Sequence, residues 1–160
     1  MYRDKIVLIL GIDPGIAITG YGLLECEGDN IKIAASGSIQ TSKNKSVQER
    51  LAELYNDILE IIDTYKPDIA SIEQLFYFKN LKTVIPVAQA RGVIIMALAQ
   101  KNVALAEYTP LQVKQTITGF GRATKDEVKQ MTALALNQPM PKLDDTVDAI
   151  AIALCHYRHI

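Results

Sequence analysis

The sequence predicts one α/β domain, built on a mixed sheet that joins a three-strand antiparallel meander to parallel strands and is flanked by helices. Three apolar segments separated by short turns predict the meander, at 5–13, 18–27 and 31–40. A helical pattern then leads to a fourth apolar segment, 67–72, and a helical crossover places such a strand parallel to the first. The chain has 160 residues, of which 49% are hydrophobic, and it shows no linker. We therefore expect a single domain over 1–160 with a substantial core.

The first helix is expected after the meander, where Ser46 and Glu49 form a capping box and Pro67 ends the helical pattern. Apolar residues recur at helical spacing and acidic residues line the opposite face, which predicts an acidic outer surface remote from any anionic ligand. The apolar positions are Val47, Leu51, Leu54, Ile58, Ile61 and Tyr65, and the acidic positions are Glu49, Glu53, Asp57 and Glu60.

The segment 83–100 is apolar on nearly all sides and predicts a buried helix, with Pro86 in its first turn and Gly92 allowing close packing. Because Pro86 and Arg91 interrupt the apolar run, we do not expect this segment to span a membrane. Residues 103–107 then predict a fifth strand.

Three more helices complete the predicted order. Capping boxes open two of them, at Thr109 and at Thr124, and Asp144 or Asp145 is expected to cap the last. The apolar positions of the helix that follows Thr124 are Val128, Met131 and Leu134.

Four carboxylates come from distant parts of the chain and are expected to converge. Asp13 stands in the turn Gly11-Ile12-Asp13-Pro14-Gly15 after the first strand, and Glu73 follows the fourth apolar segment. Asp145 and Asp148 stand three apart near the start of the last helix, so both project from one face. Unpaired acids would repel one another, whereas one or two hard divalent cations would keep all four ionised. The cluster therefore predicts a Mg²⁺ site used for phosphoryl transfer.

The formal net charge of −1 taken alone argues against a nucleic-acid-binding protein. The distribution of charge changes this, because basic residues outnumber acidic ones over 79–129, while acidic residues dominate over 46–66. If the basic segments share a face with the acid cluster, they supply contacts to phosphates. The alternative for each of these lysines is an ordinary solvated helix surface.

The cysteines and the start of the chain indicate a soluble protein. Cys26 and Cys155 are too few for a disulfide framework and match no zinc pattern with His156 and His159. We expect the thiols to fill the core in a reducing cytoplasm. The first apolar run is broken at Asp13, so no signal peptide is expected.

Taken in order, these motifs resemble the RuvC family, the bacterial Holliday-junction endonucleases of the ribonuclease H-like superfamily. The resemblance covers essentially the whole chain. Its segments are Gly11 to Gly15 with Thr19-Gly20-Tyr21-Gly22, Ile72-Glu73-Gln74 with Phe76 and Lys79-Asn80, Gln89-Ala90-Arg91-Gly92, Gln112-Val113-Lys114-Gln115, and Asp145-Thr146-Val147-Asp148-Ala149.

The resemblance implies a ribonuclease H-like fold and a crossover junction endodeoxyribonuclease with Asp13, Glu73, Asp145 and Asp148 as catalytic, metal-binding acids. Some members of the family have histidine where Asp145 stands. The implied enzyme is a homodimer that uses two Mg²⁺ per active site, with Mn²⁺ able to substitute. It nicks four-way DNA junctions symmetrically and leaves 5′-phosphate ends, in recombination and repair. The implied partners are branched DNA and a RuvA–RuvB branch-migration complex, with no membrane.

The resemblance also implies DNA contacts. Phe76 is expected to stack at the opened centre of the junction, and Lys114 and Lys125 are expected to approach phosphates. The full set of expected DNA-binding residues is Phe76, Tyr77, Lys79, Lys114, Arg122 and Lys125.

The sequence leaves two alternative functions open. It also leaves non-catalytic roles for Glu107, His156 and His159. One alternative is a catalytically silent nucleic-acid-binding relative, and the other is a phosphate-binding domain like those of actin and Hsp70. Glu107 is interpreted as structural. For His156 and His159 we expect solvent exposure or pairing with the end of the last helix.

Overall fold

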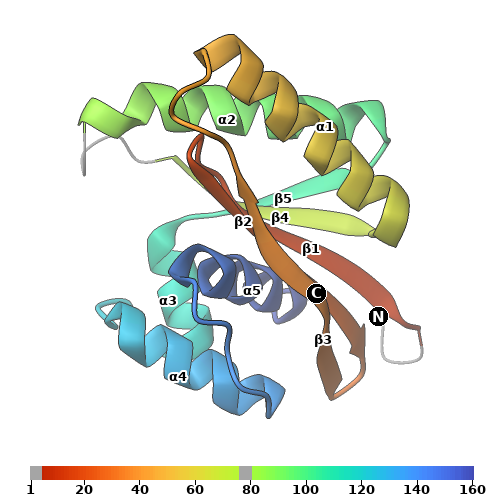
Figure 1. The fold of residues 1–160 in the computed structure, drawn as a ribbon. Helices are drawn as coiled ribbons and strands as arrows, with labels where there is room; N and C mark the ends of the chain where they lie inside the picture. Colours follow the sequence, from red (N-terminus) through yellow and green to blue (C-terminus); the bar gives the residue numbers. More distant parts are fainter. Residues whose placement is uncertain (1–4, 76–80) are drawn as a thin grey trace.

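The computed structural model describes residues 5–75 and 81–160. A five-stranded sheet in the order β3-β2-β1-β4-β5 forms its centre (Figure 1). The strands are β1 (Val7–Asp13), β2 (Ile18–Glu27), β3 (Asn30–Gln40), β4 (Ile69–Glu73) and β5 (Ala104–Tyr108). The helices are α1 (Val47–Tyr65), α2 (Leu81–Gln100), α3 (Pro110–Thr118), α4 (Lys125–Leu136) and α5 (Asp144–Tyr157).

The sheet is mixed, as the sequence predicts. β1, β2 and β3 form the antiparallel meander, while β4 pairs parallel with β1 and β5 pairs parallel with β4. Ile12 lies opposite Ile72 in the parallel pair, so β1 and β4 end at the same edge of the sheet. The residues at these two carboxyl ends, Asp13 and Glu73, are therefore neighbours in space before any side chain is considered.

Helices cover both faces of the sheet (Figure 1). Alternate residues of β1 belong to two separate cores, since successive side chains of a strand point to opposite faces. Ile9 is buried with α5, and Leu10 is buried with α1 and α2. The site depends on the first of these layers, because α5 carries two of the predicted acids.

Two glycines allow α5 to lie directly on the sheet. A Cβ atom at Gly11 would lie 1.9 Å from the carbonyl oxygen of Ala149, and one at Gly20 would lie 2.0 Å from that of Asp145. Any side chain at either position would push the helix away from β1 and β2. The close approach brings the first turn of α5 beside the end of β1, where Asp13 lies.

The three predicted capping boxes are confirmed, at Ser46, Thr109 and Thr124. The expected cap of α5 is wrong. Leu143 is the N-cap residue and makes no side-chain capping bond, while Asp144 and Asp145 lie inside the first turn. Acidic side chains there are favoured by the positive end of the helix dipole, and Asp145 is thereby free to line the site.

The predicted burial of α2 is wrong in part. The helix begins at Leu81, so Pro86 lies inside it and not in its first turn. Ile85 is 67% exposed and Met96 64% exposed, and no atom lies within 4 Å of a Cβ placed at Gly92. The buried residues of this helix among those described are Ala90, Ile94, Ala97 and Leu98. The sheet and α1 cover only one side of α2, which leaves an apolar face exposed.

Of the described helices, α2 alone is long and apolar enough to cross a membrane. Ile94 and Leu98 nevertheless pack in the core against β1 and β4. The apolar composition of α2 is explained in part by this packing, as in the core helix of a globular domain.

On two other helices, some residues of the predicted apolar stripe are exposed. On α4, Leu134 is 72% exposed and Met131 is 39% exposed, while Thr132 is buried and donates its hydroxyl hydrogen bond to the carbonyl of Val128. On α1, Val47 is 48% exposed. In both helices the apolar stripe is wider than the surface that neighbouring elements can cover.

Candidate active site

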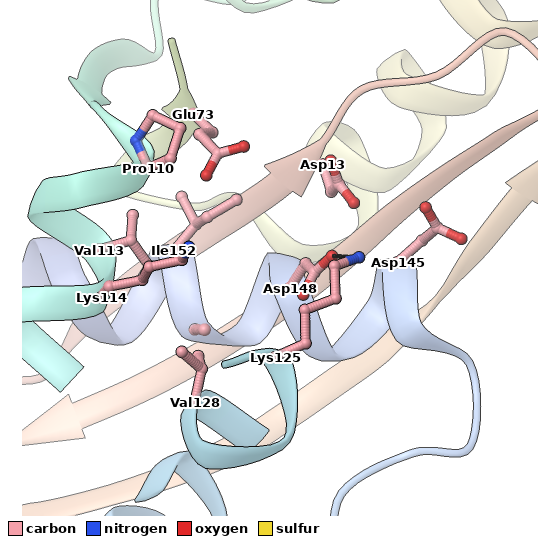
Figure 2. Close-up of a pocket in the computed structure, with 11 residues that line it drawn as sticks. Asp13, Glu73, Pro110, Val113, Lys114, Lys125, Val128, Asp145, Asp148 and Ile152 are labelled. Carbon is pink, nitrogen blue, oxygen red and sulfur yellow. Dashed lines mark ion pairs between the residues drawn. The ribbon is translucent and has the colours of Figure 1, made fainter. Parts of the chain in front are cut away.

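All four predicted acids line one hollow of about 290 Å³ (Figure 2). Asp13 and Glu73 are the last residues of β1 and β4, and Asp145 and Asp148 lie at the start of α5. The i, i+3 spacing places the last two on the same side of the helix, toward the strand ends. Three segments that are far apart in the sequence thus bring their carboxylates to one edge of the sheet.

Buried hydroxyl groups fix the backbone around the acids. Thr19 is fully buried, and its hydroxyl donates to the carbonyl of Gly15 at 2.6 Å and accepts from the Gly15 N–H at 3.2 Å. The turn that follows Asp13 is therefore held against β2. On the other side of the site, the Thr146 hydroxyl donates to the carbonyl of Gly37 at 3.0 Å, which ties α5 to β3.

The electrostatics of the hollow favour a bound cation. Burial, together with the charges of Asp148, Asp145 and Glu73, raises the pKa of Asp13 to about 8, against an opposing effect from Lys125. Burial also raises the pKa of Asp148, against an opposing effect from Lys125. Without added positive charge, Asp13 holds a proton at neutral pH, because four carboxylates in this space cannot all ionise at low cost.

Two of the predicted phosphate-binding lysines lie in the same hollow. Lys125 is the first residue of α4, and its Nζ lies 3.6 Å from Asp148 Oδ2, as the dashed line in Figure 2 marks. The capping box at Thr124 fixes this end of the helix. Lys114 reaches the hollow from α3. Both lysines therefore lie beside the acids, and their contact with phosphate stays a prediction.

Of the other predicted DNA contacts, the structure describes only Arg122, which does not line the hollow. Arg122 is exposed in the connection between α3 and α4. Phe76, Tyr77 and Lys79 lie outside the described residues. Their roles in binding DNA stay predictions.

The acids fit a divalent cation in chemistry and in charge. Carboxylate oxygens are the hard donors that Mg²⁺ prefers, and the raised pKa of Asp13 marks a deficit of positive charge. Within 5–75 and 81–160, however, no three His, Cys, Asp or Glu side chains already lie together as a complete metal site. One of the four carboxylates, Asp148, is paired with Lys125.

The expectation for His156 is wrong. This side chain is only 5% exposed, and its Nδ1 lies 2.8 Å from Tyr108 Oη, which joins α5 to β5. Burial lowers the pKa of His156, so the ring is neutral at physiological pH. A run of buried residues from Thr146 to Cys155 precedes it on α5. The near-continuous apolar composition of that run was the sequence signal for burial.

The interpretation of the cysteines as core residues is confirmed. Cys26 and Cys155 are both free and fully buried. Glu107 on β5 accepts a bond of 2.8 Å from Arg91 Nη2 on α2. This pair, which lies close to the acids, could not be predicted from the sequence pattern.

A family model described as crossover junction endodeoxyribonuclease RuvC matches residues 9–156. The chain belongs to the RuvC family. RuvC of Caldicellulosiruptor saccharolyticus is 49% identical over 150 residues, which cover 92% of this chain and 90% of that protein. RuvC of Fusobacterium nucleatum is 50% identical over 149 residues, which cover 92% of this chain and 78% of that protein.

Solved RuvC structures agree with this fold. RuvC of Thermus thermophilus in complex with a Holliday junction substrate has a TM-score of 0.90 at 29% identity, covering 96% of this chain and 94% of that chain. The yeast mitochondrial Holliday junction resolvase Ydc2 shares the fold, with a TM-score of 0.71 at 15% identity, over 98% of this chain and 81% of that chain. The predicted membership of a Holliday-junction resolvase family and the ribonuclease H-like fold are confirmed.

Proposed function

We propose that this RuvC-family protein cuts four-way DNA junctions by metal-dependent hydrolysis at the site formed by Asp13, Glu73, Asp145 and Asp148. The observation that carries the proposal is that these acids, from three distant segments, line one hollow with two lysines. Membership of the RuvC family supports a crossover junction as the substrate. The same membership disfavours the phosphate-binding domain of the actin and Hsp70 type.

The four acids would hold two Mg²⁺ ions, and Mn²⁺ would substitute for them. Such ions activate a water molecule and stabilise the leaving 3′ oxygen. The carboxylates themselves position the metal and do not attack phosphorus, so we expect no covalent enzyme intermediate. A raised pKa at Asp13 supports this assignment, because cations in the hollow would allow that carboxylate to ionise at neutral pH.

Lys114 and Lys125 would bind the DNA backbone at the rim of the hollow. Lys125 neutralises part of the acid cluster in the free protein, and a cation at Asp148 would release its ammonium group for a phosphate. Their side chains extend from α3 and α4, which lie on the face of the sheet opposite α1 (Figure 1). The acidic surface of α1 is thus kept away from the DNA, as charge repulsion requires.

Replacing both lysines tests this docking face. Lys114→Ala/Lys125→Ala should reduce the slope of log binding constant against log salt by about 2, since each lost phosphate contact removes about 1. The measurement is junction affinity over a range of salt concentrations. Lys45→Ala removes a lysine paired with Glu53 on the α1 side and should leave the slope unchanged. Equal slopes for the double variant and the wild type would show that both lysines are solvated surface.

We further propose a homodimer, with a site on each of two opposed strands, acting with a RuvA–RuvB branch-migration complex in the cytoplasm. The exposed apolar face of α2, which includes Ile85 and Met96, supports association of two copies because it leaves large apolar side chains in water.

Met96→Glu should therefore convert the dimer to a monomer in sedimentation equilibrium. Leu134→Glu is the matched control, because Leu134 is similarly exposed but lies on α4, and it should leave the mass unchanged. A monomeric wild type, or a dimer that tolerates Met96→Glu, would contradict the use of this face.

A further inference from the structure

Arg91 lies beside the acid cluster, and the roles proposed above for the four acids and the two lysines do not account for it. It lines a second hollow of about 140 Å³, and that hollow shares Asp13 and Glu73 with the first. Gln74 and Pro110 line it as well. A group bound in this second hollow would therefore lie immediately next to whatever the acids hold.

The contacts of Arg91 hold its guanidinium in place but leave some of its N–H donors without an acceptor. Nη2 is held by Glu107 at 2.8 Å, while Nε is buried and has no hydrogen-bond partner among the described residues. A buried donor without a partner destabilises the fold. The pair with Glu107 does not explain why an arginine stands here, because the Glu107 side chain is 40% exposed and exposed ion pairs contribute little.

A lysine would form the same ion pair and leave no buried Nε. What arginine adds is a rigid, planar set of N–H donors that matches the oxygens of a phosphate group. No described residue accepts a hydrogen bond from Nη1 of Arg91, and the side chain retains 18% exposure. The donor edge that Glu107 leaves unused is thus available at a hollow next to the acids.

We propose that Arg91 binds a backbone phosphate of the DNA strand being cut, next to the scissile phosphate, and that Glu107 orients its guanidinium for this contact. The inference rests on the proposed function, because it takes the acid hollow as the place of the scissile phosphate. It deepens that function by adding a second phosphate subsite, which fixes how the strand lies across the acids.

Single methylphosphonate substitutions test the contact directly. Each of the phosphates around the exchange point of a synthetic junction is made neutral in turn, and affinity is measured in Ca²⁺ so that binding and not cutting is followed. For the wild type, the positions that weaken binding should include those held by the two lysines and one further position held by Arg91, where the loss should be about tenfold, as expected for a charge-assisted hydrogen bond. Arg91→Gln should bind the unmodified junction about tenfold more weakly and should lose nothing further at that one position.

Two control variants separate phosphate binding from fold stability. Lys101→Gln removes a cation that is also paired with an acid, Asp63, just beyond the far end of α2, and should leave the methylphosphonate profile unchanged. Arg91→Lys keeps the charge and should recover only part of the affinity, since it lacks the planar donor edge. Thermal melting of each variant shows whether a loss of affinity follows a loss of folding.

If Arg91→Gln and the wild type lose the same factor at every neutral phosphate, Arg91 contacts none of them and the inference is overturned. Its role would then be to tie α2 to β5 through Glu107. The binding assay does not depend on cleavage, so a wild type that binds junctions with this coupling but fails to nick them in Mg²⁺ would support the Arg91 subsite and contradict the proposed catalysis. A wild type that binds no junction would overturn both.

Discussion

Asp13→Asn, Glu73→Gln and Asp148→Asn should each abolish Mg²⁺-dependent cleavage of a four-way junction while leaving junction binding nearly intact. Each variant removes one anionic ligand from the hollow that the four acids line. We expect a loss of at least about 1,000-fold in the single-turnover rate, because a metal ion stabilises the transition state by several kcal/mol. Binding should survive because carboxylates repel DNA and do not hold it.

Asp144→Asn is the matched control for these variants. Asp144 is the exposed neighbour of Asp145 and does not line the hollow. Its replacement removes the same charge from the same helical turn and should cost less than about tenfold in rate, since only a weak long-range effect of charge is lost. Near-normal nicking by all three acid variants would reject the metal-site assignment.

Asp13→Asn should also make the protein more stable in the absence of divalent cations. The pKa of Asp13 is raised from 3.8 to about 8 in the folded protein, so the folded state binds this proton more tightly than the unfolded state. The free energy of unfolding of the wild type therefore falls as the pH rises from about 4 to about 8. Each unit of raised pKa corresponds to about 1.4 kcal/mol, so the penalty at pH 8 is on the order of several kcal/mol.

Asp13→Asn has no carboxylate at this position, so the free energy cost of ionising Asp13 in the folded protein is absent. At pH 8 without metal its melting temperature should exceed that of the wild type by about 5 °C or more, and the difference should vanish near pH 4. Added Mg²⁺ should narrow the gap at pH 8 by stabilising the wild type. Melting curves at both pH values, with and without Mg²⁺, test this. A wild type that melts above Asp13→Asn at pH 8 without metal would show that ionisation of Asp13 does not destabilise the folded protein.

The elements that the sequence predicts well are those marked by local signals. The capping boxes place the starts of α1, α3 and α4, and the apolar segments and short turns of the meander predict β2 with its observed bounds, Ile18–Glu27. The buried faces of helices were predicted less well, as Met96 and Leu134 show. An apolar stripe is visible in a sequence, but how much of it becomes covered depends on the elements that pack against it.

The same distinction explains the site. The four acids could be predicted because two follow from strand ends and two from helical spacing, which are local features, and the resemblance to RuvC supported all four. The pairs Arg91–Glu107 and Tyr108–His156 were missed because their partners stand 16 and 48 residues apart. Only the register of β5 and the path of α5 across the sheet bring these side chains together.

The most direct test of the account is incubation of the wild-type protein with a labelled immobile four-way junction and with the linear duplexes that form its arms, in Mg²⁺ and in EDTA. We predict paired nicks on opposed strands of the junction in Mg²⁺, with 5′-phosphate ends that a ligase can reseal, and no product in EDTA. Linear duplex should remain essentially uncut. Cutting of junctions and linear arms at equal rates, or equal cutting in EDTA, would contradict the assignment of this acid cluster as the metal-dependent site of a junction resolvase.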